Sequence, residues 1–370
     1  MSEDKKNIRI VVSLDGGGTK GLYSLEILEH LAKLIGCDFT EYVDLFGGTS
    51  TGGILSIAKS RQISNEELLK LYEGEESKKI FGGLWDEFKG VLSRGEMFNS
   101  EELIKIVNQW FSTPDGASDS SQKNFFVVSL TKTGENKEIL TPVIISNYQL
   151  EETKEGPEDV IRGEVIKRLY TIGEKPLSLA DAVRATSSIP AAFQKHKQDD
   201  IEYLDGGFKY NNPVEIAYHE AKILYPKDYI VIISIGCTDK DVEGLTEKNK
   251  EVNDRLQNFL DDYEDGVTTK KVLFKGSWIK DLRECMKLFK QSKSSQQLYL
   301  EAMEIIKDDQ NAFVLRFDSA KTHSLLSFSD TSKKFFNELR ECSTNLSKDK
   351  EFTRTSSFLK KIIELKNQKE

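Results

Sequence analysis

Apolar positions along this chain follow two spacings that alternate through its first two thirds. Residues 8–14 and 229–236 form near-continuous runs rich in isoleucine and valine, which is typical of buried strands. The leucines of 19–35 instead recur at helical spacing. Strands that alternate with helices indicate a largely parallel sheet with helices on both faces. The sequence therefore predicts an α/β fold, a three-layer α/β/α sandwich.

The same patterns predict the remaining elements and a division of the chain. After Gly236 helical periodicity dominates, so we expect an α/β domain over 8–236 and a mainly helical C-terminal extension over 237–370. The other expected strands cover 42–46, 124–131, 138–146 and 311–317, and the other expected helices cover 51–60, 65–79, 100–111, 178–188, 328–342 and 350–366.

A Gly-x-Ser-x-Gly frame stands between the expected strand 42–46 and the expected helix 51–60. Its serine is Ser50, flanked by Gly48 and Gly52. A strand–turn–helix context is what a nucleophile elbow requires, because a sharp turn lifts the serine oxygen clear of the backbone. Glycines on either side permit strained dihedral angles and close packing. Short frames of this kind also arise by chance, so the frame alone leaves the role of Ser50 open.

A second glycine turn joins the first expected strand to the first expected helix. Gly16, Gly17 and Gly18 follow Asp15, which we expect to cap the turn. Unpaired N–H groups at a helix N-terminus form an anion-binding site. The oxyanion of an acyl transfer is one such anion, and it gives both glycine turns a role in one reaction.

Two other chemistries could use the same turn. The glycines at 16, 18 and 21 formally match a dinucleotide fingerprint, but the acid about 20 residues on, Asp38, follows a helix and no strand precedes it. A phosphate site of the sugar-kinase type would leave Ser50 and its glycines unexplained. Both alternatives remain open at this point.

Asp205 stands at the end of a short apolar run and precedes Gly206 and Gly207. An aspartate fixed there by paired glycines could act on a neighbouring serine. The same residues could equally form an ordinary Asp-Gly turn.

Together these turns resemble the patatin-like phospholipase family. The order and spacing of the motifs agree over about residues 8–236. The matching segments are Asp15–Gly21, Gly48–Gly52, Ala185–Phe193, Asp205–Gly207 and Asn211–Pro213.

The resemblance implies a patatin-like catalytic domain over 8–236 that uses a Ser-Asp dyad. Ser50 would be the nucleophile and Asp205 the general base, and the N–H groups around Gly16, Gly17 and Gly18 would form the oxyanion hole. The implied activity is a calcium-independent phospholipase A or lipid acyl hydrolase that acts on membrane glycerolipids through an acyl-enzyme. Neither a metal nor another cofactor is expected.

Composition agrees with a cytoplasmic protein that has a substantial core. The chain has 370 residues, a mean hydropathy of −0.46 and no apolar stretch long enough to span a bilayer. Its formal net charge of −9 argues against nucleic acid as a partner. The four cysteines are far apart, which favours reduced thiols over a disulfide framework or a zinc site.

Charge separates sharply within the extension. Residues 241–265 carry nine acids against three bases, whereas residues 267–293 carry eight Lys or Arg against two acids. Apolar residues within 267–293 fall near one face of a helix, so this segment could contact an anionic membrane peripherally or pack on the core. Trp278, Ile279, Leu282, Met286 and Phe289 make up that face.

Two further functions fit the same sequence. One is a toxin or defence effector on the patatin-like fold that stays silent until it is activated. The other is a non-catalytic lipid-binding protein, which would need neither Ser50 nor Asp205.

Overall fold

A single large sheet runs through the computed structural model. The model describes residues 6–81, 98–111, 122–133, 139–150, 160–161, 164–198, 201–238, 276–319 and 330–367. Within these ranges the sheet has nine strands, seven of them in the order β11-β10-β1-β2-β3-β4-β7, and β9 pairs with β3 while β8 pairs with β9. The strands are β1 Ile8–Leu14, β2 Leu45–Thr49, β3 Asn124–Thr133, β4 Ile139–Ser146, β7 Lys167–Tyr170, β8 Lys197–Gln198, β9 Ile201–Asp205, β10 Tyr229–Ile235 and β11 Ala312–Phe317, and β5 Val160–Ile161 pairs separately with β6 Glu164–Val165.

The five strands from β11 to β3 run parallel, and β4 and β9 run antiparallel to β3. Alternate residues of β1 explain how the sheet buries both faces: Ile10 and Val12 belong to one apolar cluster, and Val11 belongs to the other. Parallel sheets need such cover because their crossover helices pack on both sides. The predicted three-layer α/β/α fold is therefore confirmed.

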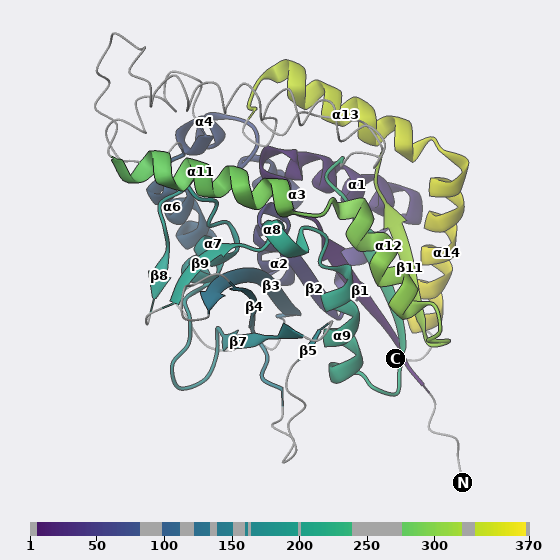
Figure 1. The fold of residues 1–370 in the computed structure, drawn as a ribbon. Coiled ribbons are helices and arrows are strands. Elements are labelled where there is room, and N and C mark those ends of the chain that lie inside the picture. The colour runs from purple at the N-terminus through teal and green to yellow at the C-terminus, as the bar shows by residue number, and fades with distance from the viewer. Residues whose placement is uncertain are drawn as a thin grey trace.

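Helices cover each face of the sheet, as Figure 1 shows. On the face of Ile10 lie α1 Gly21–Ile35, α2 Thr51–Ser60, α3 Asn65–Leu69, α4 Glu75–Phe81, α6 Ser100–Phe111, α7 Leu179–Thr186, α13 Lys333–Ser347 and α14 Lys350–Asn367. On the face of Val11 lie α8 Gly207–Tyr210, α9 Val214–Leu224, α11 Gly276–Gln291 and α12 Ser295–Ile306.

Two expected elements differ from the structure for local reasons. The helix expected over 65–79 is two helices, α3 and α4, because Gly74 between them has a φ of 102° that interrupts the helical path. The strand expected over 42–46 begins at Leu45, since residues Phe39–Tyr42 form a short 3₁₀ helix. Asp38 caps that helix by accepting the Thr40 N–H.

The described part of the C-terminal extension is built onto the same sheet and core. Strand β11 pairs in parallel with β10 along its whole length, from Ala312 beside Ile230 to Phe317 beside Ile235. Phe335 and Leu339 of α13 belong to the apolar cluster that α1 and α2 share. The boundary at Gly236 stays a prediction, but β11 and α13 do not form a separate core.

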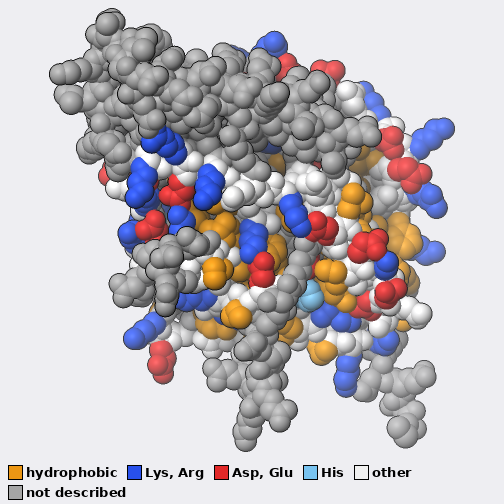
Figure 2. Space-filling model, in the orientation of Figure 1, with side chains coloured by type: hydrophobic (Ala, Val, Ile, Leu, Met, Phe, Trp, Pro, Cys, Tyr) orange, Lys and Arg blue, Asp and Glu red, His pale blue; other side chains and the backbone are white. Residues whose placement is uncertain are grey.

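Helix α11 packs on the strands around β9 through charged contacts. Asp281 pairs with Lys195 at 2.6 Å, and Glu284 pairs with Lys132 of β3. Acidic, basic and apolar side chains are interspersed on the face that Figure 2 shows.

The predicted apolar face of α11 lies outside the described side chains, and so do residues 239–275. The predicted membrane contact over 267–293 therefore stays a prediction. Among the described helices none is long and apolar enough to cross a membrane.

We expect Leu339→Ala to lower the free energy of unfolding by about 2–5 kcal/mol, because it opens a cavity in the shared core. Leu339 is fully buried, whereas Leu365 of α14 is 42% exposed and serves as the control site. Urea unfolding of Leu339→Ala and Leu365→Ala tests this. Equal, small losses in both variants would mean that the extension does not share the core.

Candidate active site

A sharp turn between β2 and α2 carries Ser50. Its φ of 53° and ψ of −123° lie in a region that residues other than glycine rarely adopt. Strain of this kind costs about 1–3 kcal/mol and persists only where the surrounding structure enforces it. The turn has the strand–turn–helix form of a nucleophile elbow, with Ser50 at its tip.

Packing leaves no room for a side chain two positions before Ser50 or two positions after it. A Cβ on Gly48 would overlap the carbonyl oxygen of Gly52, and a Cβ on Gly52 would overlap the carbonyl oxygen of Leu14 at the end of β1. The elbow therefore lies directly against the strand that leads into the glycine-rich loop.

Thr186 fixes the elbow from the opposite side. The Ser50 N–H donates to Thr186 Oγ1 at 2.9 Å, and the Thr186 hydroxyl donates to the Val128 carbonyl oxygen at 2.6 Å. Thr186 lies in the segment 185–193 that carries part of the family resemblance, but its partner is 136 residues away in the sequence. No local motif in the sequence indicates this role for Thr186.

Asp205 ends β9 beside Ser129 of β3. Its own N–H donates to the Ser188 carbonyl oxygen at 3.0 Å, and its Oδ1 accepts the Gly207 N–H at 2.6 Å. A Cβ on Gly206 would overlap the Val128 carbonyl oxygen. The paired glycines thus allow a turn that folds back on the carboxylate, which is only 2% exposed.

Burial sets the acidity of Asp205. Loss of water raises its pKa to about 7, and the Ser50 side chain and the Gly207 N–H only partly oppose that rise. Its Oδ2 is buried and has no hydrogen bond of ordinary geometry with a described residue. Ser50 thus lies close enough to Asp205 to influence its pKa, as a nucleophile and its base must.

The glycine-rich loop after β1 lies against Ser50. A Cβ on Gly16 would be 3.4 Å from the Ser50 Cβ, and Gly18 lines the same pocket as Ser50. Gly18 has a φ of 58°, so the loop turns there through a left-handed conformation.

The expectation that all three loop glycines offer oxyanion donors needs correction at Gly16. Its N–H donates to the Asn211 carbonyl oxygen at 2.9 Å and is therefore not available to a substrate. The N–H groups of Gly17 and Gly18 have no acceptor within the described part of the chain. These two remain as candidate donors.

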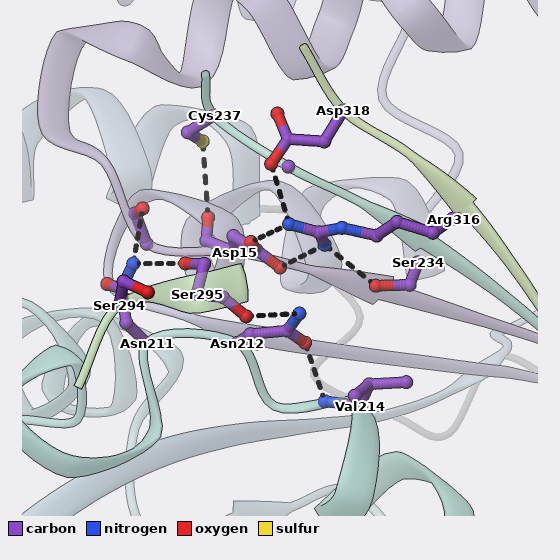
Figure 3. A network of polar contacts seen from close by, with 12 residues as sticks. Asp15, Asn211, Asn212, Val214, Ser234, Cys237, Ser294, Ser295, Arg316 and Asp318 are labelled. Atoms are coloured by element: carbon purple, nitrogen blue, oxygen red, sulfur yellow. Dashed lines mark hydrogen bonds and ion pairs between the residues drawn. The ribbon is translucent and has the colours of Figure 1, made fainter. Parts of the chain in front are cut away.

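Asp15 does not act as a simple turn cap. Figure 3 shows its carboxylate beside the guanidinium of Arg316, which lies between Asp15 and Asp318. Burial raises the pKa of Asp15 to about 6, and the charge and hydrogen bonds of Arg316 oppose that rise. No motif in the sequence indicates that Arg316 is the partner of Asp15.

An apolar pocket of about 460 Å³, including space open to solvent, adjoins Ser50. Besides Gly18, Ser50, Thr51 and Ser187, its lining is apolar or aromatic: Ile54, Leu71, Tyr72, Phe81, Phe98, Leu103, Ile189 and Phe193.

No described histidine lines this pocket. His30 lies near the Ser343 hydroxyl, and His196 stacks on Tyr203 with ring centroids 5.2 Å apart. Burial lowers the pKa of His196 to about 4, so its ring is neutral at pH 7. His323 lies outside the described residues.

The sequence matches a known protein family over the residues that carry this site. The model of the patatin-like phospholipase family matches residues 12–218, more than half of the chain. The chain belongs to the patatin-like phospholipase family.

Several curated relatives are phospholipases by name. The chain is 28% identical over 276 residues to phospholipase A I of Arabidopsis thaliana, a match that covers 63% of this chain and 21% of the plant protein. It is 25% identical over 237 residues to the cUMP-AMP-activated phospholipase of Escherichia coli, covering 62% and 65% of the two chains. It is 26% identical over 233 residues to the cGAMP-activated phospholipase of Vibrio cholerae, covering 59% of each. The matches thus span 21% to 65% of these relatives' own lengths.

We expect Asp205→Asn to stabilise the patatin-like fold more at about pH 8 than at about pH 5. The folded pKa of about 7 exceeds the unfolded value near 3.9, so the cost of burying the carboxylate grows as pH rises between them. Asparagine carries no charge and removes that cost. Urea unfolding at both pH values measures the difference.

Asp228→Asn is the control, because Arg9 pairs with Asp228 at 2.7 Å and the pKa of Asp228 is lowered. Its carboxylate is ionised at both pH values, so the loss of stability should be the same at each. A stabilisation by Asp205→Asn that does not depend on pH would contradict the raised pKa.

Proposed function

We propose that this patatin-like protein is a serine acyl hydrolase that cleaves ester bonds of membrane glycerolipids without calcium. The observation that carries the proposal is the strained Ser50 turn next to a buried, weakly acidic Asp205. The phospholipase names of its relatives support the substrate class.

In the proposed reaction Ser50 attacks the ester carbonyl while Asp205 takes its proton. A base whose pKa is about 7 is well matched to this step, because about half of it is ionised at neutral pH and it holds a proton readily. The alcohol then leaves with the proton that Asp205 returns to it, and water hydrolyses the acyl-enzyme with the ionised Asp205 again as the base.

The tetrahedral intermediates carry negative charge on the former carbonyl oxygen. The N–H groups of Gly17 and Gly18 would donate to it from the loop that lies against Ser50. Loss of one such donor typically raises the barrier by about 2.7–4 kcal/mol.

The pocket favours an acyl chain as the group that is transferred. Its lining offers aromatic and aliphatic side chains and few polar partners, so it suits a hydrocarbon better than a head group.

A second form of the proposal makes hydrolysis depend on an activator. Two relatives are named as cUMP-AMP-activated and cGAMP-activated phospholipases.

We expect the wild-type chain to release fatty acid from mixed phospholipid vesicles in the presence of a chelator, and Ser50→Ala to release none. Ser56→Ala is the matched control. Ser56 is a fully buried serine of α2, the helix that follows Ser50, and its hydroxyl has no partner in the described structure. The assay is run with and without cGAMP and cUMP-AMP. Release only with a nucleotide supports the activated form, and equal release by wild type and Ser50→Ala rules out Ser50 as the nucleophile.

We expect Phe98→Ala to shift preference toward longer acyl chains by about tenfold, since each methylene in a hydrophobic pocket is worth about 1–3 kcal/mol. Phe98 contacts Phe81 and Phe193 edge to face, with ring centroids 5.3 and 5.1 Å apart, and all three line the pocket. The measurement is the ratio of kcat/KM for long-chain and short-chain p-nitrophenyl esters. Phe313→Ala, at a 46% exposed site on β11, should leave the ratio unchanged. An unchanged ratio in Phe98→Ala would argue against this pocket as the acyl site.

A further inference from the structure

Arg316 contacts the glycine-rich loop from a part of the chain beyond the family match. It lies near the end of β11, whereas the match ends at residue 218. Its Nη1 donates to Asp15 Oδ1 at 3.0 Å and its Nη2 to Asp15 Oδ2 at 2.7 Å. The same guanidinium donates to Ser234 Oγ at 2.8 Å and to Asp318 Oδ2 at 2.7 Å, so strand β10 and the end of β11 fix it in turn (Figure 3).

Both partners of this ion pair are buried. The Arg316 side chain is 9% exposed and that of Asp15 is 0% exposed. A cationic partner favours the ionised form of a buried carboxylate, and the planar guanidinium also fixes the plane and direction of the carboxylate. A lysine ammonium would supply the charge without that geometry.

The fixed Asp15 leads directly into the candidate oxyanion donors. Its N–H donates to the Ile235 carbonyl oxygen at 3.1 Å, and the next N–H, that of Gly16, donates to the Asn211 carbonyl oxygen at 2.9 Å. Gly17 and Gly18 follow at once and bring no side chains that could hold them in place. On the helix side their carbonyl oxygens accept the Lys20 and Gly21 N–H groups. On the strand side the direction of their own N–H groups depends on what holds Asp15 and Gly16.

A second contact from beyond the family match supports the same loop. Asn211 Nδ2 donates to the Gly16 carbonyl oxygen at 3.1 Å and to Ser295 Oγ at 2.7 Å. Ser295 begins α12 and is 1% exposed. The C-terminal extension thus contacts Asp15 directly through Arg316. It contacts Gly16 indirectly, because Ser295 bonds to Asn211 and Asn211 bonds to Gly16.

We propose that Arg316 is a positioning residue for the oxyanion loop: its paired contacts with Asp15 aim the Gly17 and Gly18 N–H groups at the intermediate formed on Ser50. The role rests on the proposed hydrolase function. It makes turnover depend on the docking of β11, so the C-terminal segment contributes to the chemistry as well as to the fold.

The chain offers a matched control for this ion pair. Arg168 of β7 donates to Glu220 of α9 from Nη1 at 3.0 Å and from Nη2 at 2.7 Å. The side chain of Arg168 is 10% exposed and that of Glu220 is 0% exposed, which is close to the values for Arg316 and Asp15. Neither Arg168 nor Glu220 lines the pocket.

The experiment compares Arg316→Lys and Arg168→Lys in the full-length chain. Steady-state kinetics on a soluble p-nitrophenyl ester give kcat and KM, and hydrogen exchange reports on the amides of 15–21. We expect Arg316→Lys to lower kcat by about 10- to 100-fold and to change KM less than about twofold, because the loop is misaimed while the pocket is intact. The Asp15 and Gly16 amides should exchange faster. Arg168→Lys should leave kcat and loop exchange within about twofold of wild type.

The double variant Asp15→Asn/Arg316→Met separates positioning from folding. It removes the fully buried Asp15 charge together with its partner, and Asp318 keeps the N–H donors of Thr238 and Ser319. Its Tm should therefore recover in part relative to Arg316→Met while its kcat stays low. A wild-type kcat in Arg316→Lys, or in the double variant if the single ones do not fold, would overturn the proposal. So would unchanged loop exchange.

Failure of the hydrolase function is recognised separately. Wild type would then fail to hydrolyse the ester both with and without cGAMP and cUMP-AMP, or Ser50→Ala would hydrolyse it equally well. Loop exchange still reports in that case whether Arg316 holds the loop.

Discussion

Two carboxylates are buried near the carboxyl ends of β1 and β9, and the candidate site depends on their different surroundings. Asp15 has an arginine on both of its oxygens, whereas Asp205 accepts a backbone N–H on Oδ1 and has no hydrogen-bond partner on Oδ2 within the described structure. The same burial therefore gives Asp15 a structural role and leaves Asp205 able to accept a proton. Different environments of this kind allow one fold to give identical side chains separate roles.

The strained Ser50 turn is possible because the sheet around it is rigid. Its cost of about 1–3 kcal/mol is a large part of the net stability of a typical domain. Gly52 packs against the end of β1, and Thr186 connects the Ser50 N–H to β3. Relaxing the turn would therefore require β1, β2 and β3 to separate, which the buried contacts of the sheet oppose.

Local chemistry in the sequence was sufficient to predict the elbow, the Asp205 turn and the α/β architecture. Each depends on residues within a few positions of one another: glycines beside Ser50, glycines after Asp205, and apolar residues at strand or helix spacing. The hydrogen bond that occupies the Gly16 N–H and the role of Thr186 could not be predicted in this way. Both depend on partners that only the tertiary fold brings near.

The role of Arg316 could be predicted from the sequence only in part. A lone arginine in the apolar run 311–317 is itself a signal, because a charged side chain that a strand carries into the core needs a partner. The sequence does not say which of the 61 acidic residues that partner is, and Asp15 is 301 positions away. The parallel pairing of β11 with β10, and of β10 with β1, decides it, because these registers bring the ends of all three strands to one edge of the sheet. A motif at the start of the chain thus depends for its geometry on the strand that forms the far edge of the sheet.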